Sequence, residues 1–225
     1  MTEYQPQGFR MLPTVVKNLL IINLIVFLAT MVLEQRGYAN ITSMCALNAI
    51  PTGRFRVWQL FTYMFMHANF SHILFNMFAL WMFGYVLENY WGSRRFLFYY
   101  IVCGIGAGLC NILVPGWFLT VGASGAVFGI LLAFGMMFPN ERIYLYFLMP
   151  IKAKWFVIGY AALELLEGLF RADGIAHFAH LGGMLFGLLL ILYWRKHPFY
   201  IYIDFLNLNA RKFFNFIFNA FNQIT

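Results

Sequence analysis

Six long apolar stretches constrain the fold of this chain more than any other feature. Each approaches the roughly 20 residues that an α-helix needs to cross about 30 Å of hydrocarbon. They cover residues 14–33, 69–87, 96–115, 121–138, 153–170 and 175–194. The chain is 62% hydrophobic and 10% charged, with a mean hydropathy of +0.72, so most of its surface suits lipid better than water. The sequence therefore predicts an all-α integral membrane protein built as a bundle of six transmembrane helices.

The connections between these stretches divide the chain into three predicted parts. Residues 1–13 form a cytoplasmic N-terminal segment, residues 14–195 form the six-helix domain, and residues 196–225 form an amphipathic aromatic tail. The connection 35–68 is long and half apolar, so we expect it to lie against or partly inside the outer leaflet. The other connections are short, which predicts antiparallel neighbouring helices in one bundle.

The distribution of basic residues predicts the orientation in the membrane. An even number of spans places both termini on one side. Of the fifteen lysines and arginines, eleven fall on the side of the termini. The other four are Arg36, Arg54, Arg56 and Arg171. The positive-inside rule therefore predicts cytoplasmic N- and C-termini. The first apolar stretch is too long for a signal peptide and no transit peptide is evident, so we expect a bacterial inner membrane protein.

The remaining composition argues against several classes of function. The net charge of +7 is explained by the cytoplasmic flanks of the spans, so no nucleic-acid partner is predicted. Three cysteines are too few for a disulfide framework, and we interpret Cys103 and Cys110 as small core residues. No CxxC, HExxH or GxxxxGK motif occurs in the sequence, so we expect no metal and no cofactor.

Four polar residues inside the apolar stretches carry the predicted chemistry. Polar side chains in lipid are costly, so they are candidates for function. His72, Asn76, Ser124 and His180 all lie early in stretches that begin at the outer face, which places them at similar depth. Taken singly, a serine in a glycine-rich membrane helix is usually a packing residue. The conjunction of the four at one depth instead indicates a site.

Glycines around two of these residues predict that their helices meet. Gly122 and Gly125 surround Ser124 with little side-chain bulk. Gly125 with Gly129, and Gly183 with Gly187, form small-xxx-small pairs, which let two membrane helices approach backbone to backbone. Such an approach would let the short side chain of Ser124 reach His180.

Serine and histidine in contact form a minimal catalytic dyad. An imidazole that titrates near neutrality is a suitable base for a serine hydroxyl. Donors for the resulting oxyanion would be Asn76, His72 and the backbone N–H of Ser124. Phe128, one helical turn after Ser124, is expected to pack against the imidazole ring of His180. No aspartate lies in the six stretches, so the sequence predicts a dyad and not a triad.

Three further ionisable residues lie near this predicted site. His177 precedes His180 by three residues on nearly the same helix face, and we expect a supporting role for it, with His180 as the base. Glu164 and Glu167 lie near the outer end of 153–170. They either line a water path or substrate gate, or mark where the helix reaches water.

These motifs resemble those of the rhomboid family of intramembrane serine proteases. The resemblance covers residues 14–194 and rests on three segments: His67–Asn76, Gly122–Gly129 and Ala179–Gly183. Their HxxxN, GASG and AHxxG motifs fall in successive even-numbered spans.

The resemblance implies Ser124 as nucleophile, His180 as base, and His72 with Asn76 in the oxyanion site. It also implies a membrane-embedded first loop, and it matches Glu88 to an acid that braces helix ends. Many members carry Trp-Arg in the first loop, whereas this chain has Trp58 and Gln59.

The function expected from the residues and the resemblance is hydrolysis of peptide bonds in or near transmembrane segments of membrane proteins. The substrate would enter from the lipid bilayer between stretches 69–87 and 153–170. One alternative is a catalytically silent rhomboid-like protein that binds membrane helices; loss of Ser124 or His180 would favour it, and both are present. A transporter or channel is another alternative, which the lack of inverted repeats disfavours.

Overall fold

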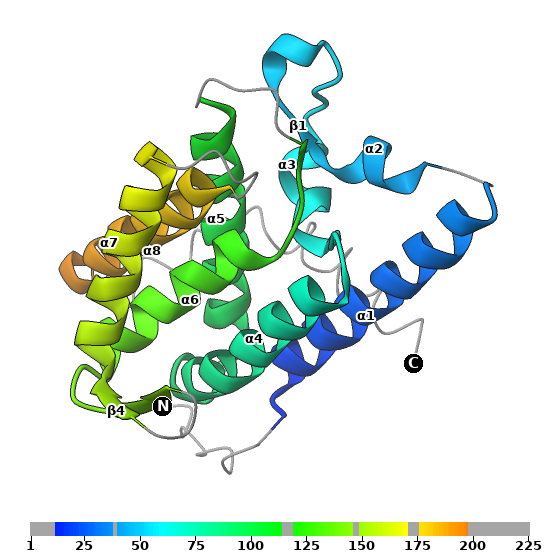
Figure 1. Cartoon of the computed structure of the whole chain (residues 1–225). Coiled ribbons are helices and arrows are strands. Elements are labelled where there is room, and N and C mark those ends of the chain that lie inside the picture. Colours follow the sequence, from blue (N-terminus) through cyan, green and yellow to red (C-terminus); the bar gives the residue numbers. More distant parts are fainter. Residues whose placement is uncertain (1–11, 38–39, 114–118, 146–148, 171–175, 198–225) are drawn as a thin grey trace. The chain divides into compact units, whose positions relative to one another are not determined.

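The computed structural model describes residues 12–37, 40–113, 119–145, 149–170 and 176–197, and within them the chain is mostly helical (Figure 1). Most of the predicted segment 1–13 and of the predicted tail 196–225 lies outside the described residues. The long helices are α1 (Thr14–Gln35), α4 (Phe70–Trp91), α5 (Ser93–Ile112), α6 (Ser124–Met137), α7 (Ala153–Phe170) and α8 (His177–Lys196). The chain divides into two compact units, residues 1–188 and residues 189–225, and the second contains the end of α8.

Short elements connect the long helices. Those in the first connection are α2 (Ile41–Cys45), β1 (Leu47–Asn48), η1 (Ile50–Thr52), α3 (Gln59–Thr62) and η2 (Tyr63–Phe65). The later ones are β2 (Leu119–Thr120), β3 (Arg142–Leu145) and β4 (Met149–Lys152). β1 pairs antiparallel with β2, and β3 pairs antiparallel with β4. The sequence predicted none of these strands.

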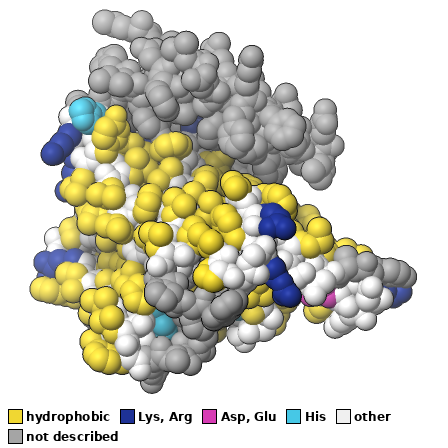
Figure 2. Space-filling view, turned by 90° about the horizontal axis from the view of Figure 1, so that it is seen from above, with side chains coloured by type: hydrophobic (Ala, Val, Ile, Leu, Met, Phe, Trp, Pro, Cys, Tyr) yellow, Lys and Arg dark blue, Asp and Glu magenta, His cyan; other side chains and the backbone are white. Residues whose placement is uncertain are grey.

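Four helices in the described part of the chain are long and apolar enough to cross a membrane: α1, α4, α5 and α8. Helix α6 has 14 residues, which correspond to about 21 Å. Helix α7 has 18 residues but carries three charged ones, Lys154, Glu164 and Glu167. Hydrophobic side chains cover much of the described surface in Figure 2. The prediction of a helical membrane protein is thus confirmed, with four helices of spanning length and composition.

Helix α6 lies at the centre of the first unit. It packs against α4, α5 and α7, and nine of its fourteen residues are buried. Its crossing with α8 depends on glycine: a Cβ on Gly183 would collide with the carbonyl oxygen of Gly125, and a Cβ on Gly129 would lie 3.1 Å from the carbonyl oxygen of Gly183. The predicted backbone-to-backbone contact is therefore present. Gly187 instead faces the hydroxyl of Tyr99 on α5.

The carboxylate of Glu88 joins the ends of three helices. Its two oxygens accept hydrogen bonds from the backbone N–H groups of Val15 (2.9 Å) and Val16 (2.8 Å), and Oε1 also accepts from the hydroxyl of Ser93 (2.6 Å). The first N–H groups of a helix lack intrahelical acceptors, so this carboxylate caps α1 from the end of α4. The brace that the resemblance implied is present.

The connection between α1 and α4 is anchored by Gln59, which stands where the resemblance implied arginine. Its side chain is buried; Oε1 accepts from the backbone N–H of Asn48 (3.3 Å), and Nε2 donates to the carbonyl of Met44 (3.2 Å). Val57 and Trp58 beside it are exposed apolar residues. The amide thus ties α3 to the segment that contains Met44 and Asn48 by one accepted and one donated hydrogen bond.

Candidate active site

The chain reaches Ser124 through a turn that only glycine adopts easily. Gly122 has a φ of 127°, and its N–H donates to the carbonyl of Tyr63 (2.9 Å), which ties the turn to the first connection. A Cβ at Gly122 would lie 2.7 Å from His72 Nε2. Helix α6 then begins at Ser124, so the N–H of Ser124 belongs to a first turn whose donors have no intrahelical acceptor.

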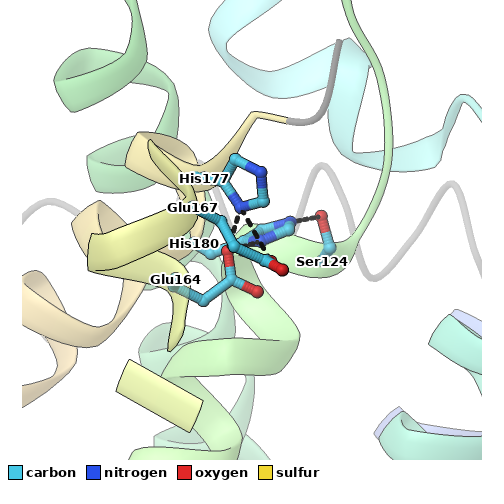
Figure 3. Close-up of polar contacts among 5 residues, drawn as sticks. All are labelled: Ser124, Glu164, Glu167, His177 and His180. Atoms are coloured by element: carbon cyan, nitrogen blue, oxygen red, sulfur yellow. Dashed lines mark hydrogen bonds and ion pairs between the residues drawn. The ribbon is translucent and has the colours of Figure 1, made fainter. Parts of the chain in front are cut away.

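His180 meets Ser124 from the first turn of α8, as the sequence predicted. His180 Nε2 lies 2.8 Å from Ser124 Oγ, although 56 residues separate the two in the chain (Figure 3). His180 is buried and Ser124 is half-buried. The distance is that of a good hydrogen bond.

Phe128 holds the plane of the imidazole. The rings of Phe128 and His180 are stacked, with centroids 4.3 Å apart and an angle of 6° between their planes. Phe128 also contacts Tyr160 of α7, with centroids 5.8 Å apart. Stacking restricts tilting of the His180 ring, but leaves rotation within its own plane to be fixed by hydrogen bonds.

The other two predicted site residues lie on the first turns of α4. Asn69 caps this helix, since its Oδ1 accepts from the N–H of His72 (2.8 Å). His72 Nε2 faces the Gly122 turn, next to Ser124. Asn76 is buried one turn later, and its Nδ2 donates to the carbonyl of His72 (2.9 Å). The structure thus brings His72 to the serine and ties Asn76 to His72.

The expectation that His180 has no acidic partner is wrong. Oε2 of Glu164, on α7, lies 2.8 Å from Nδ1 of His180 and also 2.8 Å from Nδ1 of His177 (Figure 3). Glu164 and His177 are both buried, and Glu167 Oε2 is 3.9 Å from Nδ1 of His177. No aspartate lies in the six apolar stretches, and the partner is instead a glutamate. The available signal was a glutamate and two histidines predicted near the outer ends of adjacent helices.

The same cluster has the composition of a metal site. In the described part of the chain, Glu164, His177 and His180 each offer a ligand atom within 4.8 Å of the others. A carboxylate with two imidazoles is a common zinc ligand set. Here each Nδ1 also lies within hydrogen-bond distance of the Glu164 carboxylate.

Comparisons with known proteins identify the family. A family profile described as the Rhomboid domain matches residues 54–197, more than half of the chain. The chain is 31% identical over 177 residues to RHOMBOID-like protein 1 of Arabidopsis thaliana, covering 78% of this chain and 42% of that protein. It is 27% identical over 176 residues to Rhomboid-like protease 3 of Toxoplasma gondii, covering 77% of this chain and 66% of that one.

A bacterial relative is also similar. The putative rhomboid protease YdcA of Bacillus subtilis is 33% identical over 136 residues, which cover 59% of this chain and 65% of that protein. The alignments thus span less than two thirds of the length of these relatives. The matching domain, the relatives and the apolar helices agree: this chain is a membrane protein that belongs to the rhomboid family.

Proposed function

We propose that this protein is an intramembrane serine endopeptidase that hydrolyses peptide bonds in or near transmembrane segments, with Ser124 as nucleophile and His180 as base. The observation that carries the proposal is the 2.8 Å contact between Ser124 Oγ and His180 Nε2. Two distant segments meet there in the geometry that proton transfer from a serine requires. Relatives named as proteases support the same conclusion.

The chemistry follows from this contact. As Ser124 Oγ bonds to the carbonyl carbon of the scissile peptide, its proton passes to His180 Nε2. The resulting imidazolium then gives this proton to the nitrogen of the departing chain, and the C–N bond breaks. A water molecule, deprotonated in turn by His180, hydrolyses the acyl-enzyme and frees Ser124. No cofactor takes part in these steps.

The charge that develops on the peptide oxygen needs donors. The N–H of Ser124, in the first turn of α6, is one. The proposed side-chain donors are His72, which lies beside the Gly122 turn, and Asn76, which lies one helical turn after His72. In other serine proteases, loss of one such donor costs about 10²–10³ in rate.

The proposed membrane arrangement has six spans, formed by α1, α4, α5, α6, α7 and α8, with the connection 36–69 partly embedded in the outer leaflet. The site residues lie at the N-terminal ends of α4, α6 and α8. Basic residues follow the opposite ends of α4 and α6, as at Arg95 and Arg142, and Arg195 lies in the last turn of α8. The positive-inside rule therefore favours a site near the outer face and cytoplasmic termini. We propose that the membrane is a bacterial inner membrane.

Substrates are proposed to be transmembrane helices of other proteins, which enter from the lipid between α4 and α7. Both helices expose large apolar side chains, including Phe75 (70% exposed) on α4 and Leu166 (53% exposed) on α7. A helical peptide carbonyl is bonded to its own chain and lipid offers no replacement partner, so the substrate must unwind where it meets water. Segments with weak helical turns should therefore be cleaved best.

Cleavage of a reporter transmembrane segment by the purified protein in liposomes tests the proposal. Ser124→Ala and His180→Ala are each expected to abolish cleavage while leaving the helical circular dichroism unchanged. Ser71→Ala, which removes an exposed hydroxyl from α4, is the matched control and should cleave at the parental rate. Parental cleavage by Ser124→Ala would reject the proposal. Binding of the reporter without cleavage by the parent would favour the catalytically silent alternative.

A further inference from the structure

On the side that faces away from Ser124, the His180 ring has an acidic partner that a serine–histidine dyad lacks. Nδ1 of His180 lies 2.8 Å from Glu164 Oε2, while Nε2 lies 2.8 Å from Ser124 Oγ. A neutral imidazole has one N–H and one bare nitrogen, and a carboxylate only accepts. The proton of the resting ring must therefore be on Nδ1, which leaves Nε2 bare to accept the serine proton.

We propose that Glu164 is a positioning residue for the reaction, which fixes the tautomer and the orientation of His180 and stabilises the imidazolium that forms during catalysis. This inference rests on the proposed function, because it assigns a role to Glu164 through His180. It adds a positioning residue on α7 to the proposed catalytic pair on α6 and α8. The distances from Ser124 to His180 and from His180 to Glu164 match those of a hydrogen-bonded serine–histidine–acid series.

The stacking of Phe128 on His180 does not determine which edge of the imidazole faces Glu164. A phenyl ring parallel to the imidazole fixes its plane, but it has no polar group that distinguishes the ring nitrogens from the ring carbons. A ring flipped by 180° would stack on Phe128 equally well. The carboxylate of Glu164 favours one of the two orientations, because only an N–H can face it.

His177 orients the carboxylate in turn. Its Nδ1 lies 2.8 Å from the same oxygen of Glu164, so two N–H donors converge on Oε2. An ionised carboxylate oxygen can accept from both donors without taking a proton. When the serine proton arrives at Nε2, Nδ1–H and Oε2 become an ion pair in a buried setting, where such attraction is strong.

The packing of α7 against α8 allows this contact. A Cβ on Gly168, one turn after Glu164, would lie 3.1 Å from Cβ of His177 and 3.2 Å from the ring of Phe178. The absence of a side chain at Gly168 lets the end of α7 approach the start of α8. Glu164 can then reach His180 from the neighbouring helix.

Kinetics of Glu164→Gln test the proposal with the full chain in liposomes. The amide keeps the shape of the side chain but removes its charge. We expect kcat to fall by about 10²–10⁴, with KM within about threefold of the parent, because the loss concerns the transition state and not substrate binding. Glu164→Asp, which keeps the charge, should retain more of the parental kcat than Glu164→Gln. Glu141→Gln, at an exposed glutamate just before β3, is the matched control, with an expected kcat within about threefold.

Three outcomes of these kinetics would overturn the proposal. They are a kcat of Glu164→Gln within threefold of the parent, an equal loss in Glu141→Gln, or a loss carried by KM alone. Ser124→Ala in the same assay separates this inference from the proposed function. If Ser124→Ala is inactive and Glu164→Gln is fully active, the protease proposal stands and only the role of Glu164 falls.

A second measurement reads the tautomer in the parental protein itself. In the parental protein labelled with ¹⁵N-histidine, solid-state NMR reports which ring nitrogen of His180 carries the proton, and the spectrum of His180→Asn assigns the signal. The expected result is a protonated Nδ1 and a bare Nε2 in the neutral resting enzyme. A proton on Nε2 would overturn the proposal.

Discussion

Substitution of Gly183 by alanine tests whether the close crossing of α6 and α8 produces the reactive geometry. The new Cβ would collide with the carbonyl oxygen of Gly125, one residue after Ser124. Unbonded carbon and oxygen atoms stay about 3 Å or more apart, so the two helices must separate by roughly 1 Å. The distance of 2.8 Å between Ser124 Oγ and His180 Nε2 would then grow to roughly 3.8 Å, beyond the range of a hydrogen bond.

A misplacement of about 1 Å in reacting groups costs about 10²-fold in rate. We therefore expect the kcat of Gly183→Ala to fall at least about 100-fold, with a cost in stability of about 1–3 kcal/mol from overpacking. Reporter cleavage in liposomes gives kcat, and thermal unfolding in detergent gives the stability. Gly159→Ala is the control, because a Cβ there meets nothing within 4 Å. A Gly183→Ala protein that is folded and cleaves within threefold of the parental rate would refute the reasoning.

Three further predictions follow from single contacts. Phe128→Ala loses the stack on His180 and should lower kcat about 3–10-fold, whereas Phe128→Tyr keeps the ring and should remain within twofold; equal rates for Phe128→Ala and the parent would contradict this. Glu88→Gln weakens the cap on α1 and should lower the free energy of unfolding by about 1–3 kcal/mol, measured by thermal unfolding, with unchanged activity of the folded fraction. Burial, with a smaller effect of His72, lowers the pKa of His67, between η2 and α4, from its ordinary value of 6.5 to about 4. The unfolded chain thus binds this proton first, so stability should fall as pH drops from 6.5 toward 4; His67→Gln should reduce this fall, and an unchanged pH dependence would contradict the assignment.

The sequence predicted the features that depend on lipid and on small side chains. The apolar stretches mark the long helices because each must satisfy its own backbone in hydrocarbon. The small-xxx-small pairs Gly125 with Gly129 and Gly183 with Gly187 are readable because a close helix crossing tolerates little else. Together with the depth of Ser124 and His180, these pairs were enough to predict that the two side chains meet.

Features that depend on contacts between distant segments were not predictable. The β1–β2 pair joins Leu47 to Thr120, and no local pattern in either segment indicates this pairing. Glu164 was readable only as an acid near a helix end, since its role depends on how α7 lies against α8. The side chain of Gln59 bonds to the backbone of Asn48 and Met44, and the residue type alone does not specify these partners.

Labelling with a fluorophosphonate, which forms a covalent adduct with an activated serine, tests the central claim most directly. The protein in liposomes is treated with the probe, and the adduct is located by mass spectrometry of its peptides. We predict a single adduct, on Ser124, formed at least about 100-fold faster in the parent than in His180→Asn. An adduct on another residue, or equal labelling rates in the two proteins, would contradict the claim that His180 activates Ser124.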